Sequence, residues 1–218
     1  MIRSGKIKAL FLDEWEIETE FIADISGRLQ FLWIVPNATH QMNKKQNELQ
    51  EDFESLHLTF NMRNAVDIVE ESKLVMKTKP FRHKEGLAPT PPNFPRGFPP
   101  VQVKTLDDAI DHARKLTSDG ILIIANTSFD VPFWLLRDQK ADFYGTLINV
   151  DDSVDSIQDP IQALKNGRIL VTTQAFISGF EWPTVIHLSL SKNANIADVE
   201  DHECNIFLRC TNQLIISD

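Results

Sequence analysis

Short apolar runs recur along this chain, each about as long as a β-strand, and polar or helix-patterned segments separate them. The runs occupy residues 9–12, 29–35, 101–104, 120–126, 143–150, 168–173, 184–190 and 213–217, and residues 56–60 alternate in polarity. Several runs are apolar at nearly every position, which is typical of strands that are covered on both faces. Strands of this kind that alternate with helices predict an α/β fold around a mostly parallel sheet.

Helical periodicity fills two of the intervals between the runs. In the first, Ile17, Phe21, Ile22 and Ile25 have helical spacing, and Gly27 is placed to end the helix. In the second interval a helix is predicted after Thr105, its expected N-cap. Its apolar residues at helical spacing are Leu106, Ala109, Ile110, Ala113 and Leu116.

The composition is that of an ordinary soluble globular chain of 218 residues, 42% hydrophobic and 24% charged. The formal net charge of −9 means that any contact with nucleic acid needs a local basic face or a partner domain. The only two cysteines, Cys204 and Cys210, fit a reducing intracellular compartment, cytoplasmic or nuclear, and we expect both to pack on one helix. No apolar run approaches the roughly 18 residues of a membrane-spanning helix, so no membrane partner is expected.

Residues 88–100, APTPPNFPRGFPP, contain six of the eleven prolines of the chain. This composition predicts a loop or an extended, polyproline-like connection. Two interpretations are open: a surface linker, or a peptide-like docking segment.

An acid pair ends the first apolar run, in the sequence LFLDEWE at residues 10–16. Ligands of open α/β sheets lie beyond the carboxyl ends of the strands, which is where Asp13 and Glu14 fall. Such a pair can hold Mg²⁺, often through water, while the second acid deprotonates an attacking water. The alternative is a solvated strand end or a helix N-terminus, where acids are also favourable.

Four further stretches follow in order: FLWIVPNATHQ at 31–41, LTFNMRN at 58–64, ILVTTQAFISGFEWPTVI at 169–186 and NIFLRCTNQLII at 205–216. Together with LFLDEWE, this set resembles the ordered motifs of superfamily 1 helicases of the UvrD/Rep type, from about residue 7 to the C-terminus. LFLDEWE resembles the Walker B motif and FLWIVPNATHQ the motif whose glutamine senses the γ-phosphate. The other three resemble the N-Y-R, T-x-H-x-x-K-G-L-E-F and A-L-S-R-A motifs.

The resemblance implies a RecA-like architecture of the P-loop NTPase class, with ATP and Mg²⁺ as cofactors. Residues 1–54 would form the C-terminal part of a first lobe, and residues 55–218 a second lobe with a mostly parallel sheet. Asp13 would bind Mg²⁺, Glu14 would be the general base, and Gln41 would contact the attacking water or the γ-phosphate.

The second lobe would supply the remaining site residues. Arg63 and Arg209 would reach across a cleft between the lobes and neutralise charge on the phosphoryl group, a role that suits an always-charged fork of donors. Glu181 would lie near the ribose, and Gly179 would allow the tight loop before it. Arg63, Arg209, Glu181 and Gln41 each also have a simple alternative as a polar residue of a surface helix or loop.

Several positions depart from the family pattern. Glu16 replaces the final glutamine of D-E-x-Q, Pro36-Asn37 replaces Gly-Asp, and Met62 stands where an aromatic residue stacks on adenine. The remaining departures are Ala175, Ser178 and Leu208, at the positions of His, Lys and a hydroxyl residue.

The largest departure is that no G-x-x-x-x-G-K-[ST] phosphate loop occurs in the 218 residues. We therefore expect either a fragment, completed by a missing N-terminal lobe or a partner chain, or a protein that has lost its nucleotide cradle. Three functions are open: the ATP-binding motor portion of a DNA or RNA helicase that acts on single-stranded nucleic acid, a degenerate module for protein interaction, and an unrelated α/β domain.

Overall fold

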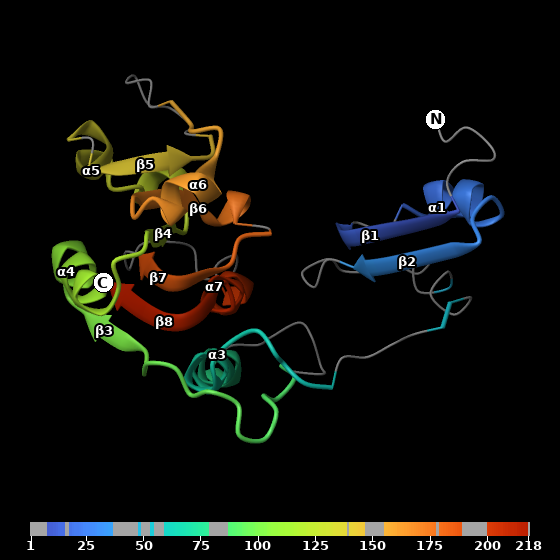
Figure 1. Ribbon diagram of the computed structural model, residues 1–218, viewed down its shortest axis with the longest axis horizontal. Coiled ribbons are helices and arrows are strands. Elements are labelled where there is room, and N and C mark those ends of the chain that lie inside the picture. Colours follow the sequence, from blue (N-terminus) through green and yellow to red (C-terminus); the bar gives the residue numbers. More distant parts are fainter. Residues whose placement is uncertain are drawn as a thin grey trace. The chain divides into compact units, whose positions relative to one another are not determined.

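A computed structural model describes most of the chain, in residues 8–15, 18–36, 48, 53–54, 59–78, 87–138, 140–146, 155–177, 179–188 and 200–217. At residues 13–15, 36, 76–78, 200–202 and 204 it describes the backbone alone. The chain divides into two compact units, Met1–His57 and Leu58–Asp218 (Figure 1). We call them the N-terminal unit and the C-terminal unit.

The N-terminal unit is a β-α-β element. Strand β1 (Ala9–Trp15) pairs in parallel with β2 (Phe31–Pro36), and helix α1 (Thr19–Ser26) connects them. Ile22 and Ile25 of α1 are buried against one face of the two strands. The expected helix is confirmed, and it ends at Gly27.

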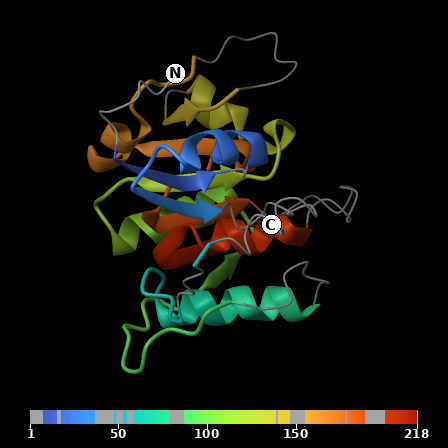
Figure 2. The ribbon, with the colours of Figure 1, turned by 90° about the vertical axis from the view of Figure 1, so that its right-hand side faces the viewer.

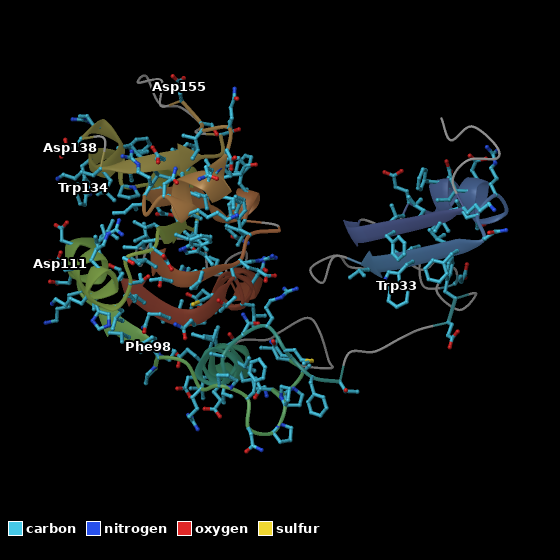
Figure 3. All side chains as sticks on the ribbon, in the orientation of Figure 1. Trp33, Phe98, Asp111, Trp134, Asp138 and Asp155 are labelled. Carbon is cyan, nitrogen blue, oxygen red and sulfur yellow. The ribbon has the colours of Figure 1, made fainter. Side chains whose placement is uncertain are left out.

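The other face of this strand pair carries exposed aromatic side chains. Phe11 is 68% exposed, and its ring centroid lies 5.6 Å from that of Phe31, which in turn stacks on Trp33 at 6.3 Å. Trp33 projects from β2 (Figure 3). Parallel strands are normally covered on both faces. In this unit α1 covers one face, and the aromatic face is uncovered by any other described residue.

The C-terminal unit contains a six-stranded sheet in the order β3-β8-β7-β4-β6-β5, and every pairing in it is parallel. The strands are β3 (Val101–Val103), β4 (Ile121–Ala125), β5 (Ala141–Tyr144), β6 (Ile169–Thr173), β7 (Trp182–Leu188) and β8 (Cys210–Ser217). The predicted α/β class with a parallel sheet is confirmed.

Helices cover both faces of this sheet. Helices α4 (Leu106–Leu116) and α5 (Phe133–Arg137) pack on one face, and α3 (Val66–Thr78), α6 (Pro160–Lys165) and α7 (Glu200–Phe207) pack on the other. Two 3₁₀ turns, η1 (Ser128–Asp130) and η2 (Gln174–Phe176), follow β4 and β6. Figures 1 and 2 show α3 beside α7 and β8. No helix among the described residues is long and apolar enough to cross a membrane.

The all-apolar strands divide their side chains between two cores because successive residues point to opposite faces. In β4, Ile121 and Ile123 join the core under α4 and α5, whereas Leu122 and Ile124 join the core under α3, α6 and α7. The N-cap predicted for α4 is confirmed: the Thr105 side chain accepts a hydrogen bond from the Asp108 backbone N–H at 3.1 Å.

Two strand predictions were misplaced. Strand β5 occupies Ala141–Tyr144 and ends at Gly145, whose φ of 137° breaks the strand, and residues 147–150 of the predicted run lie outside the described residues. Strand β8 begins at Cys210 and not at residue 213, so the expectation that Cys210 lies on a helix was wrong. Thr59 and Phe60, the described end of the alternating run, are not in a strand.

The proline-rich residues 87–100, which we call the proline strap, follow the surface of the C-terminal unit. Its turn at Pro91–Phe94 places Asn93 at a φ of 61°, and the Phe94 N–H donates to the Pro91 carbonyl at 3.2 Å. This geometry is that of a β-turn with proline followed by a residue of positive φ, and not of a continuous polyproline helix.

The proline strap caps helix α3. The carbonyls of Pro95 and Arg96 accept hydrogen bonds from the first N–H groups of the helix, those of Val66 (3.0 Å) and Asp67 (3.1 Å). The Arg96 guanidinium also lies 2.7 Å from the Asp67 carboxylate. Since the first N–H groups of a helix have no acceptor inside it, the strap supplies the acceptors for two of them.

Candidate functional site

The turn between α7 and β8 is where distant parts of the C-terminal unit meet. The five carbonyls of residues 208–212, in this turn and in the first three residues of β8, all accept hydrogen bonds from other segments. The donors are Asn64 Nδ2 to Leu208 (2.8 Å) and Cys210 (2.7 Å), Trp182 N to Arg209 (3.0 Å), Ala65 N to Thr211 (3.0 Å) and Phe98 N to Asn212 (3.2 Å). Three of the stretches singled out in the sequence, around residues 63, 181 and 209, therefore converge at the amino ends of β7 and β8.

Arg63 and Glu181 form an ion pair at this place. The Arg63 Nε lies 2.8 Å from a Glu181 carboxylate oxygen, and the two side chains are 55% and 36% exposed. Arg63 precedes α3 by three residues, and Glu181 directly precedes β7. Gly179, two residues earlier, has a φ of 77°, which glycine adopts without strain.

Arg209 lies in the turn itself and is nearly buried, with 9% of its surface exposed. Its Nη2 donates to the Asn205 side-chain oxygen at 3.0 Å, one helical turn back in α7. Helix α7 ends at Phe207, so Arg209 follows the helix. Because a guanidinium stays charged, this arrangement holds a fixed positive charge at the base of the turn.

The structure does not describe the side chains of the predicted Mg²⁺ and water site, so it does not show whether they lie near Arg63 and Arg209. Asp13 and Glu14 lie in the last part of β1, where the pairing with β2 becomes irregular after Leu12, and their side chains are outside the described structure. Gln41 also lies outside the described residues. Within the part of the chain that the structure describes, no group of three or more His, Cys, Asp or Glu side chains could hold a metal ion.

Two asparagines of the cluster had no role in the sequence interpretation. Asn64 is buried and contacts the turn on both sides of Arg209, and Asn61 accepts hydrogen bonds from the Arg63 and Asn64 N–H groups at 2.9 and 3.1 Å. The available signal was two asparagines three residues apart just before a helix, a spacing typical of turns and caps.

A second buried polar pair lies at the opposite, carboxyl edge of the sheet. The His187 Nε2 lies 3.2 Å from the Asn126 Oδ1, and the Asn126 Nδ2 donates to the Leu188 carbonyl at 2.8 Å. These bonds join the ends of β4 and β7, and they are far along the strands from Arg63 and Arg209.

Comparisons with known proteins find a likeness among solved structures. No protein-family model matches the chain, and no curated protein matches it. The crystal structure of the C-terminal domain of a possible DNA helicase from Lactobacillus plantarum WCFS1 is similar at a TM-score of 0.41 and 14% sequence identity, over 73% of this chain and 87% of that chain. A likeness at this level assigns no family to the chain.

Proposed function

We propose that residues 58–218 are the second RecA-like lobe of a helicase-like module, and that Arg63 and Arg209 act at the phosphates of a bound ATP. The observation that carries the proposal is the convergence of Arg63, Glu181 and Arg209 at one end of a parallel sheet. These residues come from three separate stretches that resemble helicase motifs, and an unrelated fold gives no reason for them to meet.

The chemistry of this donor set fits a polyphosphate. Two guanidinium groups offer planar, permanently charged donors, which are the preferred partners of phosphate oxygens. Bound ATP would supply the phosphoryl group, and Arg63 and Arg209 would bind and orient its oxygens. Under the same proposal Asp13 would hold Mg²⁺, with Glu14 and Gln41 at the water, and single-stranded nucleic acid would be the partner of the module.

One observation favours a second candidate, a degenerate module that acts in protein interaction without hydrolysis. Arg63 already has the Glu181 carboxylate as a partner, and Arg209 is nearly buried beside Asn205. Both arginines therefore have partners inside the unit, as purely structural residues would.

Equilibrium titration with a fluorescent ATP analogue and Mg²⁺ separates the two candidates. Because the 218 residues contain no phosphate loop, we expect weak but saturable binding, without turnover by this chain alone. Arg63→Ala should raise the dissociation constant about tenfold, which corresponds to about 1.4 kcal/mol.

Arg168→Ala is the matched control for this titration. Arg168 is also an exposed arginine at the amino edge of the sheet, and it lies 2.9 Å from Asp142 in an ion pair of its own. It is separated from β7 by β4, so its loss should leave the dissociation constant unchanged. Absence of saturable binding, or equal effects of the two substitutions, would favour the interaction module.

A further inference from the structure

We propose that Asn61 and Asn64 form an asparagine clamp that fixes the positions of Arg63 and Arg209 relative to each other. Asn64 is then a positioning residue that acts through the two arginines. The geometry of the clamp is independent of any ligand, and only its effect on nucleotide binding rests on the proposed function.

The first observation is how completely the Asn64 side chain is used. The residue is 1% exposed, and its Nδ2 donates both to the Leu208 carbonyl (2.8 Å) and to the Cys210 carbonyl (2.7 Å). These two carbonyls stand on either side of Arg209, more than 140 residues further along the chain. One amide therefore holds the backbone of Arg209 from both sides.

The second observation is the link from Asn64 back to Arg63. The Asn61 Nδ2 donates to the Asn64 Oδ1 at 2.9 Å, and the Asn61 Oδ1 accepts from the Arg63 N–H at 2.9 Å and from the Asn64 N–H at 3.1 Å. The hydrogen bonds form one continuous path from the Arg63 backbone through Asn61 and Asn64 to the turn that carries Arg209.

Only an amide fits the position of Asn64. Two carbonyls need two donors on one short side chain, and the Asn61 amide needs an acceptor, which together match the donors and acceptor of asparagine. An aspartate would set a carboxylate against two carbonyl oxygens, and an alanine would leave both carbonyls without this donor in a buried place. The residue type is therefore determined by the connection between the two arginine-bearing segments.

The test compares Asn64→Ala with Ser72→Ala. Ser72 is the matched control because it is also fully buried and polar, and its hydroxyl donates to the Ile68 carbonyl (2.8 Å) inside α3, away from either arginine. The first readout is the ¹⁵N NMR signal of the arginine Nε–H groups without nucleotide. Asn64→Ala should change the chemical shifts of Arg63 and Arg209 and leave that of Arg168 unchanged. Ser72→Ala should leave the shifts of Arg63 and Arg209 unchanged.

The second readout is a double-mutant cycle on binding of the fluorescent ATP analogue. Asn64→Ala should raise the dissociation constant about tenfold in the native background and less than twofold in an Arg209→Ala background, because a residue that acts through Arg209 has nothing left to position. A merely structural role would give the same factor in both backgrounds.

If Asn64→Ala does not fold, Asn61→Ala replaces it, because this change removes the link to Arg63 and leaves the two bonds of Asn64 to the turn in place. Arginine signals that stay unchanged in a folded clamp variant, or equal effects in the two backgrounds, would overturn the clamp. Absence of any nucleotide binding by the native chain would count against the proposed function alone, since the NMR comparison still decides on the clamp.

Discussion

Burial sets the chemistry of Cys210, the first residue of β8. The residue is fully buried, its Sγ lies 3.6 Å from the Pro183 carbonyl, and burial raises the pKa of the thiol to about 12. Only the thiolate reacts readily, so the folded protein should protect this side chain at neutral pH. The raised pKa also means that Cys210 stabilises the fold fully below the ordinary thiol pKa of about 8.5, and that this contribution is lost as the pH rises toward 12.

We expect Cys210 in a Cys204→Ser variant to react with a disulfide reagent at pH 8 far more slowly in the folded protein than in urea. The release of the coloured thiol, followed over time, measures both rates. Equal rates in the two conditions would mean that Cys210 is not buried.

Glu181 is the residue at which the resemblance and the structure give different expectations. The resemblance places it at a ribose, whereas here it lies 2.8 Å from the Arg63 guanidinium. We expect Glu181→Gln to change the free energy of unfolding by less than about 1 kcal/mol, because the pair is partly exposed. The same change should strengthen binding of the ATP analogue, because it removes a negative charge beside Arg63, and weaker binding would favour the ribose role.

Among the structural elements, the proline strap depends on a close approach at Gly97. This residue has a φ of 78°, and a Cβ added to it would lie 2.5 Å from the Ala65 Cβ and 2.9 Å from the Asn212 carbonyl oxygen. Gly97→Ala should therefore lower the free energy of unfolding by about 1–3 kcal/mol, from overpacking and backbone strain.

Urea denaturation measures this loss, with Gly27→Ala as the control. Gly27 has a φ of −69°, and a Cβ added to it would meet no atom within 4 Å, so its replacement should stay within about 0.5 kcal/mol of the native protein. A Gly97→Ala variant as stable as the control would mean that the strap does not approach Ala65.

The sequence predicted an element well where neighbouring residues alone determine it, and poorly where distant residues do. Strands β4 and β6 are apolar at nearly every position, so periodicity alone found them. Strand β8 begins at Cys210 and continues with Thr211, Asn212 and Gln213, whose polar side chains hid its start. The buried Gln213 donates to the Pro99 carbonyl at 3.4 Å, a partner that only the folded strap provides.

The candidate site was predictable in part for the same reason. Motif resemblance selected Arg63, Glu181 and Arg209, but neither the ion pair nor the clamp follows from it. The bonds of Asn64 join residues more than 140 positions apart, and no local pattern encodes such a contact. The partner of Arg63 and the turn around Arg209 are properties of the tertiary structure.

In the whole molecule, the C-terminal unit builds a hydrophobic core on each face of its six-stranded sheet from its own residues. Residues 58–218 should therefore fold without residues 1–57 and unfold in one cooperative transition, the behaviour of most single domains of up to about 150 residues. Circular dichroism during heating tests this expectation. A broad, non-cooperative transition of the isolated unit would show that its fold depends on the N-terminal unit.

If Arg63 and Arg209 act at the phosphates of a nucleotide, their Nε–H signals in the 218-residue protein should respond to that nucleotide. Addition of ATP with Mg²⁺ should shift the signals of Arg63 and Arg209, more than ADP does at equal saturation, and leave that of Arg168 in place. Signals of Arg63 and Arg209 that do not respond to ATP, or that respond no more than that of Arg168, would show that these arginines do not act at the phosphates.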